Sequence, residues 1–234
     1  MRLPAGDLAG TCEGFVLAGG RSSRMGKDKS LVSFNGVPLV RCAIEILRAA
    51  GLDPHIAGAR VDLSPYAPAV ADDPAHAGLG PLAGICPALE VCSARFAVFI
   101  PVDLPLLPPG LVSYLVHHAQ VTESAITLAS ICGFVETFPV VIARDAAPML
   151  KASLRSEDRK CLNAFRRAAE ALSRPCSAVP VELLLQAGQI CDPDGLPPRA
   201  WFLSINNTED LAEAEAFLRP QPDPDPLFPR TSVP

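Results

Sequence analysis

The sequence lacks any apolar run that approaches the roughly 20 residues needed to span a membrane, although hydrophobic residues make up 49% of the chain. Residues 1–11 carry one arginine but no continuous apolar segment, so they do not predict a secretory signal peptide. We therefore expect a cytoplasmic protein that does not associate with membranes. No internal repeat is present either, and the length favours one main domain.

An excess of positive charge is also missing. The formal net charge is −5, which argues against a broad nucleic-acid-binding face and favours small-molecule partners. The eight cysteines include no Cys-x-x-Cys pair, and several lie among apolar neighbours, as Cys86 and Cys132 do. This pattern favours free buried thiols in a reducing compartment over a zinc site.

Two standard nucleotide-binding motifs are absent. The sequence contains no Gly-x-x-x-x-Gly-Lys-Ser/Thr loop, and no Gly-x-Gly-x-x-Gly follows the first expected strand. The simplest kinase and dehydrogenase classes are therefore excluded.

A glycine-containing basic loop is present near the N-terminus. The apolar run Phe15–Leu17 stops at Gly19-Gly20, and residues 21–29 then hold four cations and one anion. Such a loop suits a polyphosphate, because glycines let backbone N–H groups approach the oxygen atoms while Arg and Lys offset the charge. A Gly-Gly turn followed by a solvated basic stretch is the alternative. The density of cations in an otherwise acidic chain favours phosphate binding.

Hydrophobic patterning predicts alternating helices and strands. Strands are expected at 15–18, 54–58, 95–102, 125–129, 138–142 and 201–205. Helices are expected at 38–51, 81–93, 108–120, 146–172 with a charged interruption at 154–160, and 209–218 with Thr208 as its cap. This alternation predicts an α/β fold with three layers and a mostly parallel central sheet.

Charged side chains follow several of the expected strands. In an open parallel sheet the ligand site lies at the carboxyl ends of the strands, where the basic loop, Asp72-Asp73 and Asp103 are all expected. Carboxylates beside cations suit a nucleoside triphosphate with its magnesium ion, which takes hard oxygen ligands. Asp103 could instead cap the next helix. Pro108-Pro109 place the start of that helix too far along the chain for a simple cap, which favours a metal ligand.

These residues also carry a family resemblance. The stretch Leu17-Ala18-Gly19-Gly20-x-x-x-Arg24-Met25-Gly26-x-Asp28-Lys29, followed by Asn35-Gly36-x-Pro38-Leu39, resembles the signature loop of Rossmann-like nucleotidyltransferases. Matches at 80–84, 101–105 and 206–211 narrow the resemblance to the molybdenum cofactor guanylyltransferases. The resemblance predicts a nucleotidyltransferase domain at 13–218, preceded by an N-terminal extension (1–12). The proline-rich composition of residues 219–234 predicts a disordered tail.

The resemblance implies transfer of GMP from GTP to the terminal phosphate of molybdopterin, with release of pyrophosphate and with Mg²⁺ as cofactor. It implies catalytic roles for Arg24, Lys29 and Asp103, metal binding by Asp103, and a substrate contact by Asn206. The nucleotide contacts that it implies are Leu17, Ala18, Gly19, Gly20, Lys29, Asp73 and Asp103. Molybdoenzymes or other cofactor-biosynthesis proteins are the expected protein partners, and the chain is expected to be a monomer or a weak oligomer.

Three departures from the family pattern leave alternatives open. Gly58 lies where an Asn is expected, Ser204 replaces another Asn, and a proline expected after Thr208 is displaced. Cytidylyl transfer to the same pterin is therefore an alternative, because relatives share the first loop and differ where the base is bound. A non-catalytic nucleotide-binding protein is another. The presence of both Lys29 and Asp103 favours an enzyme.

Overall fold

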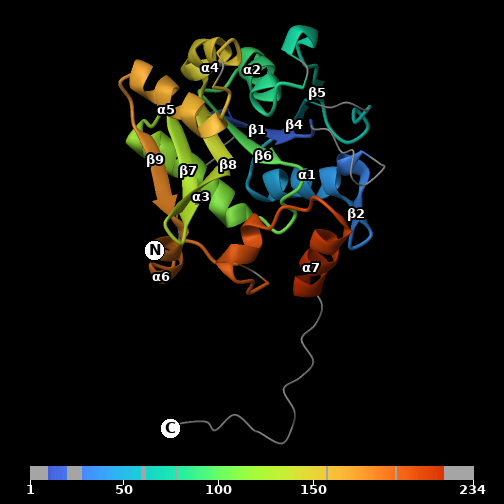
Figure 1. Cartoon of the computed structure of the whole chain (residues 1–234). Helices are drawn as coiled ribbons and strands as arrows, with labels where there is room; N and C mark the ends of the chain where they lie inside the picture. Colours follow the sequence, from blue (N-terminus) through green and yellow to red (C-terminus); the bar gives the residue numbers. More distant parts are fainter. Residues whose placement is uncertain are drawn as a thin grey trace, which may run out of the picture.

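A computed structural model describes residues 10–19, 28–58, 62–76, 78–156, 158–192 and 194–218. The chain forms a twisted central sheet with helices on both faces (Figure 1). The expected α/β class with three layers is therefore confirmed. The expected tail (219–234) and most of the expected N-terminal extension (residues 1–9) lie outside the described residues.

The central sheet has seven strands in the order β5-β4-β1-β6-β8-β7-β9. Only β8 runs antiparallel to its neighbours β6 and β7, whereas the other paired strands are parallel, as expected for a mostly parallel sheet. The strands are β1 (Cys12–Leu17), β4 (Pro54–Ala57), β5 (Ala69–Val70), β6 (Phe96–Pro101), β7 (Ile126–Ile131), β8 (Phe134–Ala143) and β9 (Cys176–Pro180). A separate small hairpin pairs β2 (Ser33–Phe34) with β3 (Val37–Pro38).

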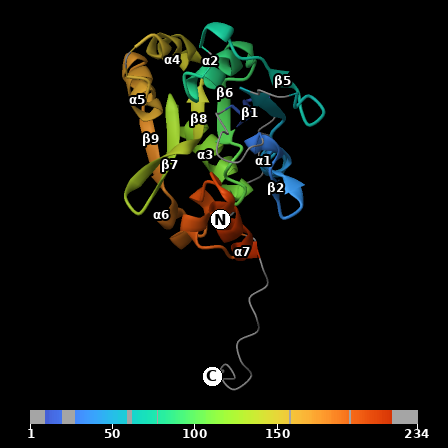
Figure 2. The same cartoon turned by 45° about the vertical axis from the view of Figure 1, so that its right-hand side comes forward.

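Helices cover both faces of this sheet, because successive side chains of a strand point to opposite sides. On β1, Val16 packs into the core beneath α1 (Leu39–Ala49) and α3 (Pro109–Thr122). Its neighbours Phe15 and Leu17 pack into the second core. That core lies beneath α2 (Leu82–Val91), α4 (Ala147–Leu154) and α5 (Cys161–Ala171), which Figure 2 shows on the side of the sheet opposite to α1. The strand expected at 95–102 is β6, which contributes Phe99 to one core and Val98 to the other and is therefore covered on both faces.

One expected strand is absent. Residues 201–205 do not join the sheet; a 3-10 helix (Pro198–Phe202) occupies the first part of the segment instead. Pro197 and Pro198 lack the N–H groups that a sheet ladder requires. Trp201 is fully buried in the core on the α1 side, so its apolar character reflects packing against that core.

The C-terminal helix α7 (Thr208–Leu218) was predicted correctly, but its cap was not. Asn207 precedes the helix, and its Oδ1 accepts hydrogen bonds from the backbone N–H groups of Glu209 (2.8 Å) and Asp210 (2.9 Å). Asn207 is therefore the N-cap, and Thr208 is the first residue of the helix. The sequence patterns also missed β9 and the short α6 (Val181–Gln186), which follow Pro175 and Pro180.

The thiols are all free, as expected, but not all of them are buried. Cys86 is buried, and burial raises its pKa to about 12. Cys132 is exposed in the tight turn that joins β7 and β8. In the described part of the chain, no helix is both long and apolar enough to cross a bilayer.

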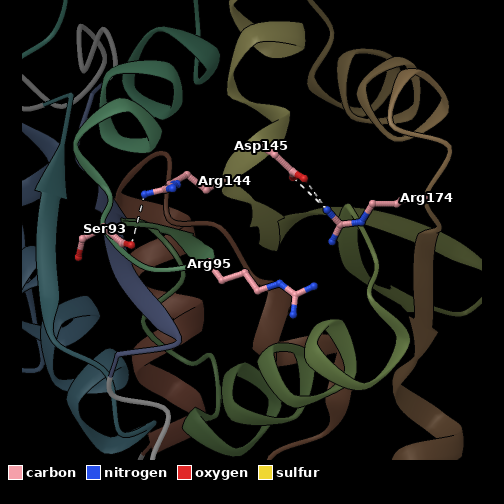
Figure 3. Close-up of a pocket in the computed structure, with 5 residues that line it drawn as sticks. All are labelled: Ser93, Arg95, Arg144, Asp145 and Arg174. Atoms are coloured by element: carbon pink, nitrogen blue, oxygen red, sulfur yellow. Dashed lines mark hydrogen bonds and ion pairs between the residues drawn. The ribbon is translucent and has the colours of Figure 1, made fainter.

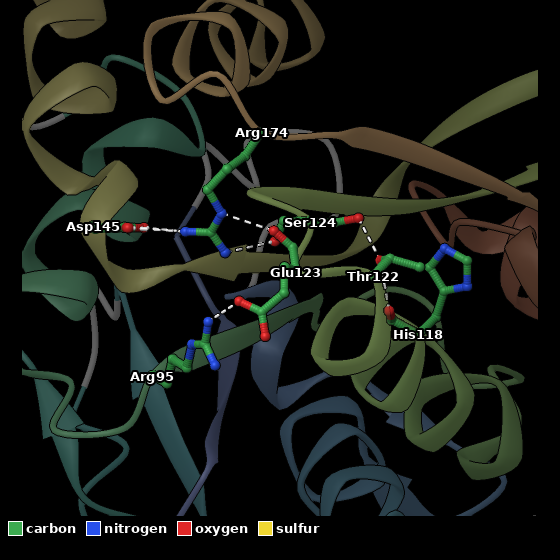
Figure 4. A network of polar contacts seen from close by, with 7 residues as sticks. All are labelled: Arg95, His118, Thr122, Glu123, Ser124, Asp145 and Arg174. Carbon is green, nitrogen blue, oxygen red and sulfur yellow. Dashed lines mark hydrogen bonds and ion pairs between the residues drawn. The ribbon is translucent and has the colours of Figure 1, made fainter.

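Arginines dominate the amino edge of the sheet, where the parallel strands begin. Three of them surround a cavity of about 360 Å³ (Figure 3). Arg174 donates to both carboxylate oxygens of Asp145 at 2.9 and 3.0 Å, and to the carbonyl oxygens of Glu123 (2.7 Å) and Ser124 (3.3 Å) (Figure 4). Arg95 pairs with the Glu123 carboxylate. These arginines hold the ends of several strands together, and most of their charge is neutralised by the neighbouring carboxylates.

Glu13 ties the start of β1 to the same edge. Its Oε1 accepts hydrogen bonds from the Ser93 hydroxyl (2.6 Å), the Ser93 N–H (2.9 Å) and the Ala94 N–H (3.1 Å). Partial burial alone would raise the pKa of this carboxyl, but the hydrogen bonds from Ser93 and Ala94 outweigh burial and lower the pKa. The ionised form is therefore favoured in the folded chain.

This geometry predicts a pH-dependent effect of Glu13→Gln. A group whose pKa is lowered by folding stabilises the fold above its unfolded pKa, and that contribution is lost as the pH falls through its folded pKa. At pH 7 the variant should lose about 1–2 kcal/mol of unfolding free energy, typical of hydrogen bonds to a charged group. The difference from wild type in urea unfolding should shrink as the pH is lowered through the acid range.

Glu45→Gln is the matched control, because Glu45 forms only an exposed i,i+3 pair with Arg48 on α1. It should change stability by less than about 1 kcal/mol. A loss for Glu13→Gln that stays constant from pH 7 into the acid range would contradict the assignment.

Candidate functional site

Strands β1, β4 and β6 end side by side at the carboxyl edge of the sheet. Leu17, the last residue of β1, is in register with Ala57 of β4 and Pro101 of β6. Backbone hydrogen bonds continue the alignment, from Ala18 N–H to Ala57 O (2.9 Å) and from Val102 N–H to Leu17 O (3.1 Å). The segments that follow these three strands are thus brought to one place, the edge where ligands bind in open α/β sheets.

A lysine and an aspartate that are far apart in the sequence meet at this edge. Lys29 Nζ lies 2.6 Å from Asp103 Oδ2 and donates to Asn206 Oδ1 at 2.8 Å. The side chains of Lys29 and Asp103 are each 20% exposed. The structure confirms that Lys29, the last residue of the basic loop, meets Asp103, and it places the expected substrate residue Asn206 in the same cluster.

The backbone around Lys29 is fixed by its neighbours. Lys29 opens a 3-10 helix (Lys29–Leu31), and the preceding Asp28 caps this helix by accepting from the Ser30 N–H at 3.0 Å. Ser30 is fully buried. Asp28 thus has a local structural task, and it holds the base of the Lys29 side chain close to Asp103.

Asp103 does not cap a helix. The cap position of α3 belongs to Pro108, with no side-chain hydrogen bond, so the capping alternative is excluded. Instead, Asp103 Oδ2 accepts from the Ser204 hydroxyl at 2.7 Å as well as from Lys29. The carbonyl oxygen of Asp103 also accepts from the Ile205 N–H at 3.0 Å. Sequence patterning placed 201–205 in a strand and so did not detect this contact.

Glycines allow the ends of β1 and β4 to approach closely. A Cβ atom on Gly19 would lie 2.7 Å from the carbonyl oxygen of Gly58, a distance that real Cβ atoms essentially never show. Gly58 has a φ of +74°. A Cβ atom on Gly84 of α2 would lie 3.5 Å from the Gly58 backbone, an ordinary van der Waals distance. The first glycine of the Gly-Gly pair is therefore required by backbone packing. A Cβ atom on Gly58 would lie 3.4 Å from Asp72 Oδ1 and from the Gly19 backbone, so this position favours glycine over the expected Asn.

Asp73 lies on the loop that follows β5. Its carboxylate accepts from the Ala75 N–H at 2.9 Å and lies 2.9 Å from His76 Nδ1. These two contacts lower the pKa of the Asp73 carboxyl, the backbone contact being the larger cause. The side chain is 43% exposed, so it caps its own short 3-10 helix (Pro74–His76) while remaining open to a ligand.

Of the remaining expected site residues, the structure describes three and leaves two outside its described ranges. Leu17 and Ala18 are buried, each 7% exposed, and Gly19 is exposed. Gly20 and Arg24 lie outside the described residues. Within the described ranges, no group of three or more His, Cys, Asp or Glu side chains gathers as a metal site would require.

Solved structures show the same fold. Over 88% of this chain, the structure superposes with a TM-score of 0.69 and 23% identity on 98% of molybdopterin-guanine dinucleotide biosynthesis protein A from Archaeoglobus fulgidus. A Mycobacterium tuberculosis H37Rv protein crystallised as a manganese complex matches 89% of this chain and 99% of its own, with a TM-score of 0.58 and 18% identity. The fold is that of the nucleotidyltransferases.

Sequence comparison identifies the family within this fold. Residues 14–173 match the family model of the MobA-like NTP transferase domain. A molybdenum cofactor guanylyltransferase of Sinorhizobium fredii is 31% identical over 230 residues, which cover 90% of this chain and 93% of that protein. The chain therefore belongs to the MobA-like NTP transferase family.

The close approach of Gly19 to Gly58 predicts that Gly19→Ala is destabilising. The added methyl group would meet a backbone oxygen, so β1 and β4 must separate at their ends, at a cost of about 1–3 kcal/mol. Urea unfolding of the variant measures this loss. Gly110→Ala is the matched control, because its Cβ would lie 3.9 Å from the nearest atom and alanine is the better helix former. Equal stability of wild type and Gly19→Ala would contradict the packing argument.

Proposed function

We propose that this chain transfers GMP from GTP to the terminal phosphate of molybdopterin and releases pyrophosphate. The observation that carries the proposal is the Lys29–Asp103–Asn206 cluster at the carboxyl edge of the sheet. It places a cation, a carboxylate and an amide where the glycine loop would deliver a triphosphate. Family membership and the name of the Sinorhizobium fredii relative support the same reaction.

The phosphates are the part of the nucleotide that these charges suit. In this proposal Lys29 releases Asp103 and binds phosphate oxygens, and Arg24 of the same loop adds a second cation. The backbone of Leu17, Ala18, Gly19 and Gly20 contacts the nucleotide, and Asp73 contacts it from the loop after β5. Cations placed beside the transferring phosphoryl group stabilise the charge that develops there and on the departing pyrophosphate.

Asp103 is the proposed magnesium ligand. Mg²⁺ commonly binds through one or two carboxylates together with substrate phosphates, so one carboxylate, without a cage of further ligands among the described residues, fits it. A bound Mg²⁺ would neutralise and orient the phosphate oxygens. The chain's own residues hold the carboxylate in place and keep Lys29 within reach of the same phosphates.

The acceptor supplies its own nucleophile. Because the terminal phosphate of molybdopterin attacks the α-phosphate of GTP directly, the reaction requires no Ser, Cys or His nucleophile. Asn206 is the proposed contact to this substrate, since it lies beside Lys29 at the same edge. We also propose that the nucleotidyltransferase domain spans 13–218, and that the protein acts in the cytoplasm as a monomer or weak oligomer.

Pyrophosphate release is the first test of this proposal. With molybdopterin and Mg²⁺ present, we expect release with GTP and little with CTP. Release with CTP alone would support the proposed phosphate chemistry but contradict the assignment of guanine as the base. Gly58 in place of the expected Asn is the specific reason to test CTP. Release with neither nucleotide would overturn the proposed reaction in favour of a non-catalytic nucleotide-binding protein.

Asp103→Asn supplies the inactive control for this assay. Loss of the metal carboxylate should reduce turnover about 100-fold or more, with the circular dichroism spectrum unchanged. Asp145→Asn makes the same chemical change at the amino edge and should keep its turnover. Full activity of Asp103→Asn would contradict the assignment of Asp103 as the magnesium ligand.

Lys29→Ala tests the phosphate contact separately from catalysis. Loss of a charge-assisted hydrogen bond to phosphate should weaken GTP binding by about 10- to 100-fold, measured by calorimetry. Arg48→Ala, which removes an exposed cation from α1, should leave GTP affinity unchanged. If Lys29→Ala binds GTP as tightly as wild type does, Lys29 does not contact the phosphates.

A further inference from the structure

We propose that Ser204 is a positioning residue for Asp103. Its hydroxyl holds one oxygen of the carboxylate and leaves the other free to bind the metal ion. This inference rests on the metal role of Asp103 in the proposed function, and it assigns a task to a residue at which the chain departs from the family pattern.

The two oxygens of the Asp103 carboxylate have different surroundings. Oδ2 accepts two hydrogen bonds, from Lys29 Nζ at 2.6 Å and from Ser204 Oγ at 2.7 Å. Oδ1 accepts none from the residues that the structure describes. Two donors from different segments hold Oδ2 and restrict the rotation of the carboxylate, and Ser204 is the donor that remains once Lys29 has moved to the phosphates. Oδ1 is thereby left as the oxygen available to a cation.

The Ser204 hydroxyl is itself oriented by Asn206. Asn206 Nδ2 lies 3.1 Å from Ser204 Oγ and 3.1 Å from the Ser204 carbonyl oxygen. A hydroxyl group has a single proton to donate, and a donor at its lone pair directs that proton away from the donor. Asn206 therefore supports the direction in which Ser204 donates, toward Asp103. The three residues form a chain of hydrogen bonds from amide to hydroxyl to carboxylate.

The segment that carries Ser204 is anchored by its neighbours. The Ile205 N–H donates to the Asp103 carbonyl at 3.0 Å, so the main chains at 103 and 205 are joined directly. Trp201 and Ile205 are fully buried in the core on the α1 side. Ser204 thus reaches Asp103 from a fixed backbone, as a group that orients a metal ligand must.

A positioning role and a purely structural role predict different results. If Ser204 only stabilised residues 203–207, its removal would lower the unfolding free energy and leave the metal dependence unchanged. If it orients Asp103, its removal weakens metal binding, whereas kcat recovers when the metal is saturating. The conservative Ser204→Thr variant keeps the hydroxyl and separates the two roles further.

The test measures metal binding by two routes. Mn²⁺ serves as the probe, with free Mn²⁺ followed by electron paramagnetic resonance as it is titrated into the full-length protein without nucleotide. The second measurement is the metal concentration that gives half-maximal pyrophosphate release from GTP with molybdopterin. The variants are Ser204→Ala, Ser204→Thr and Asp103→Asn. Ser64→Ala is the matched control, since Ser64 Oγ donates to the exposed carboxylate of Asp62 at 2.6 Å.

Ser204→Ala should weaken Mn²⁺ binding and raise the half-maximal metal concentration by about 10-fold, the lower end of the range for groups that orient a metal ligand. Its kcat at saturating metal should stay within about threefold of wild type, and Ser204→Thr should bind Mn²⁺ within about twofold of wild type. Ser64→Ala should behave as wild type.

Two further outcomes distinguish failure of this inference from failure of the proposed function. If Asp103→Asn loses Mn²⁺ and Ser204→Ala binds it as wild type does, the positioning role is wrong and the metal role of Asp103 stands. If Asp103→Asn also binds Mn²⁺ as wild type does, the metal assignment fails, and the role of Ser204 fails with it.

Discussion

The burial of β1 between β4 and β6 is the constraint on which the rest of the structure depends. Parallel strands bury both faces, and β1 is covered by α1 on one side and α2 on the other. Because the strands on both sides are parallel to β1 and in register with it, all three stop at the same level. The segments that follow β1 and β6 therefore begin next to each other, and Lys29 and Asp103, which come from these segments, are in contact.

Both edges of the sheet carry arginine or lysine beside carboxylates, but the two clusters differ in how many hydrogen-bond partners their charged groups have. At the amino edge, Arg174 uses its donors on Asp145 and on two backbone carbonyls, so the charges are already satisfied by the fold. At the carboxyl edge, the side chains of Lys29 and Asp103 are as exposed as that of Arg174, at 20% each, but Oδ1 of Asp103 has no hydrogen-bond donor among the described residues. The cavity lined by Arg95, Arg144 and Arg174 lies at the amino edge, and the Lys29–Asp103–Asn206 cluster lies at the carboxyl edge.

Most of the fold could be predicted from the sequence because its strands are short apolar runs with clear ends. The run at 95–102 and the stop at Gly19-Gly20 fix β6 and β1, and the rule that ligands bind at the carboxyl edge then brings Lys29 and Asp103 together. Trp201 misled the prediction, because an apolar residue in a buried 3-10 helix resembles one in a strand. The Ser204 contact could not be predicted, since it depends on a tertiary approach of segments about one hundred residues apart.

In the proposed function, the residues for the phosphates are better defined than the residues for the base. Asp103 follows the buried strand β6, and Lys29 contacts it. If these two residues bind the triphosphate as proposed, they contact groups that GTP and CTP share, and they would not distinguish the two nucleotides. In the proposed function, discrimination would come from other segments, and in the segment after β4 Gly58 contributes no side chain and has a φ of +74°. Backbone groups or residues farther along the chain, such as Asp73, would then select the base. We therefore propose that phosphate chemistry and base choice depend on different segments of this chain.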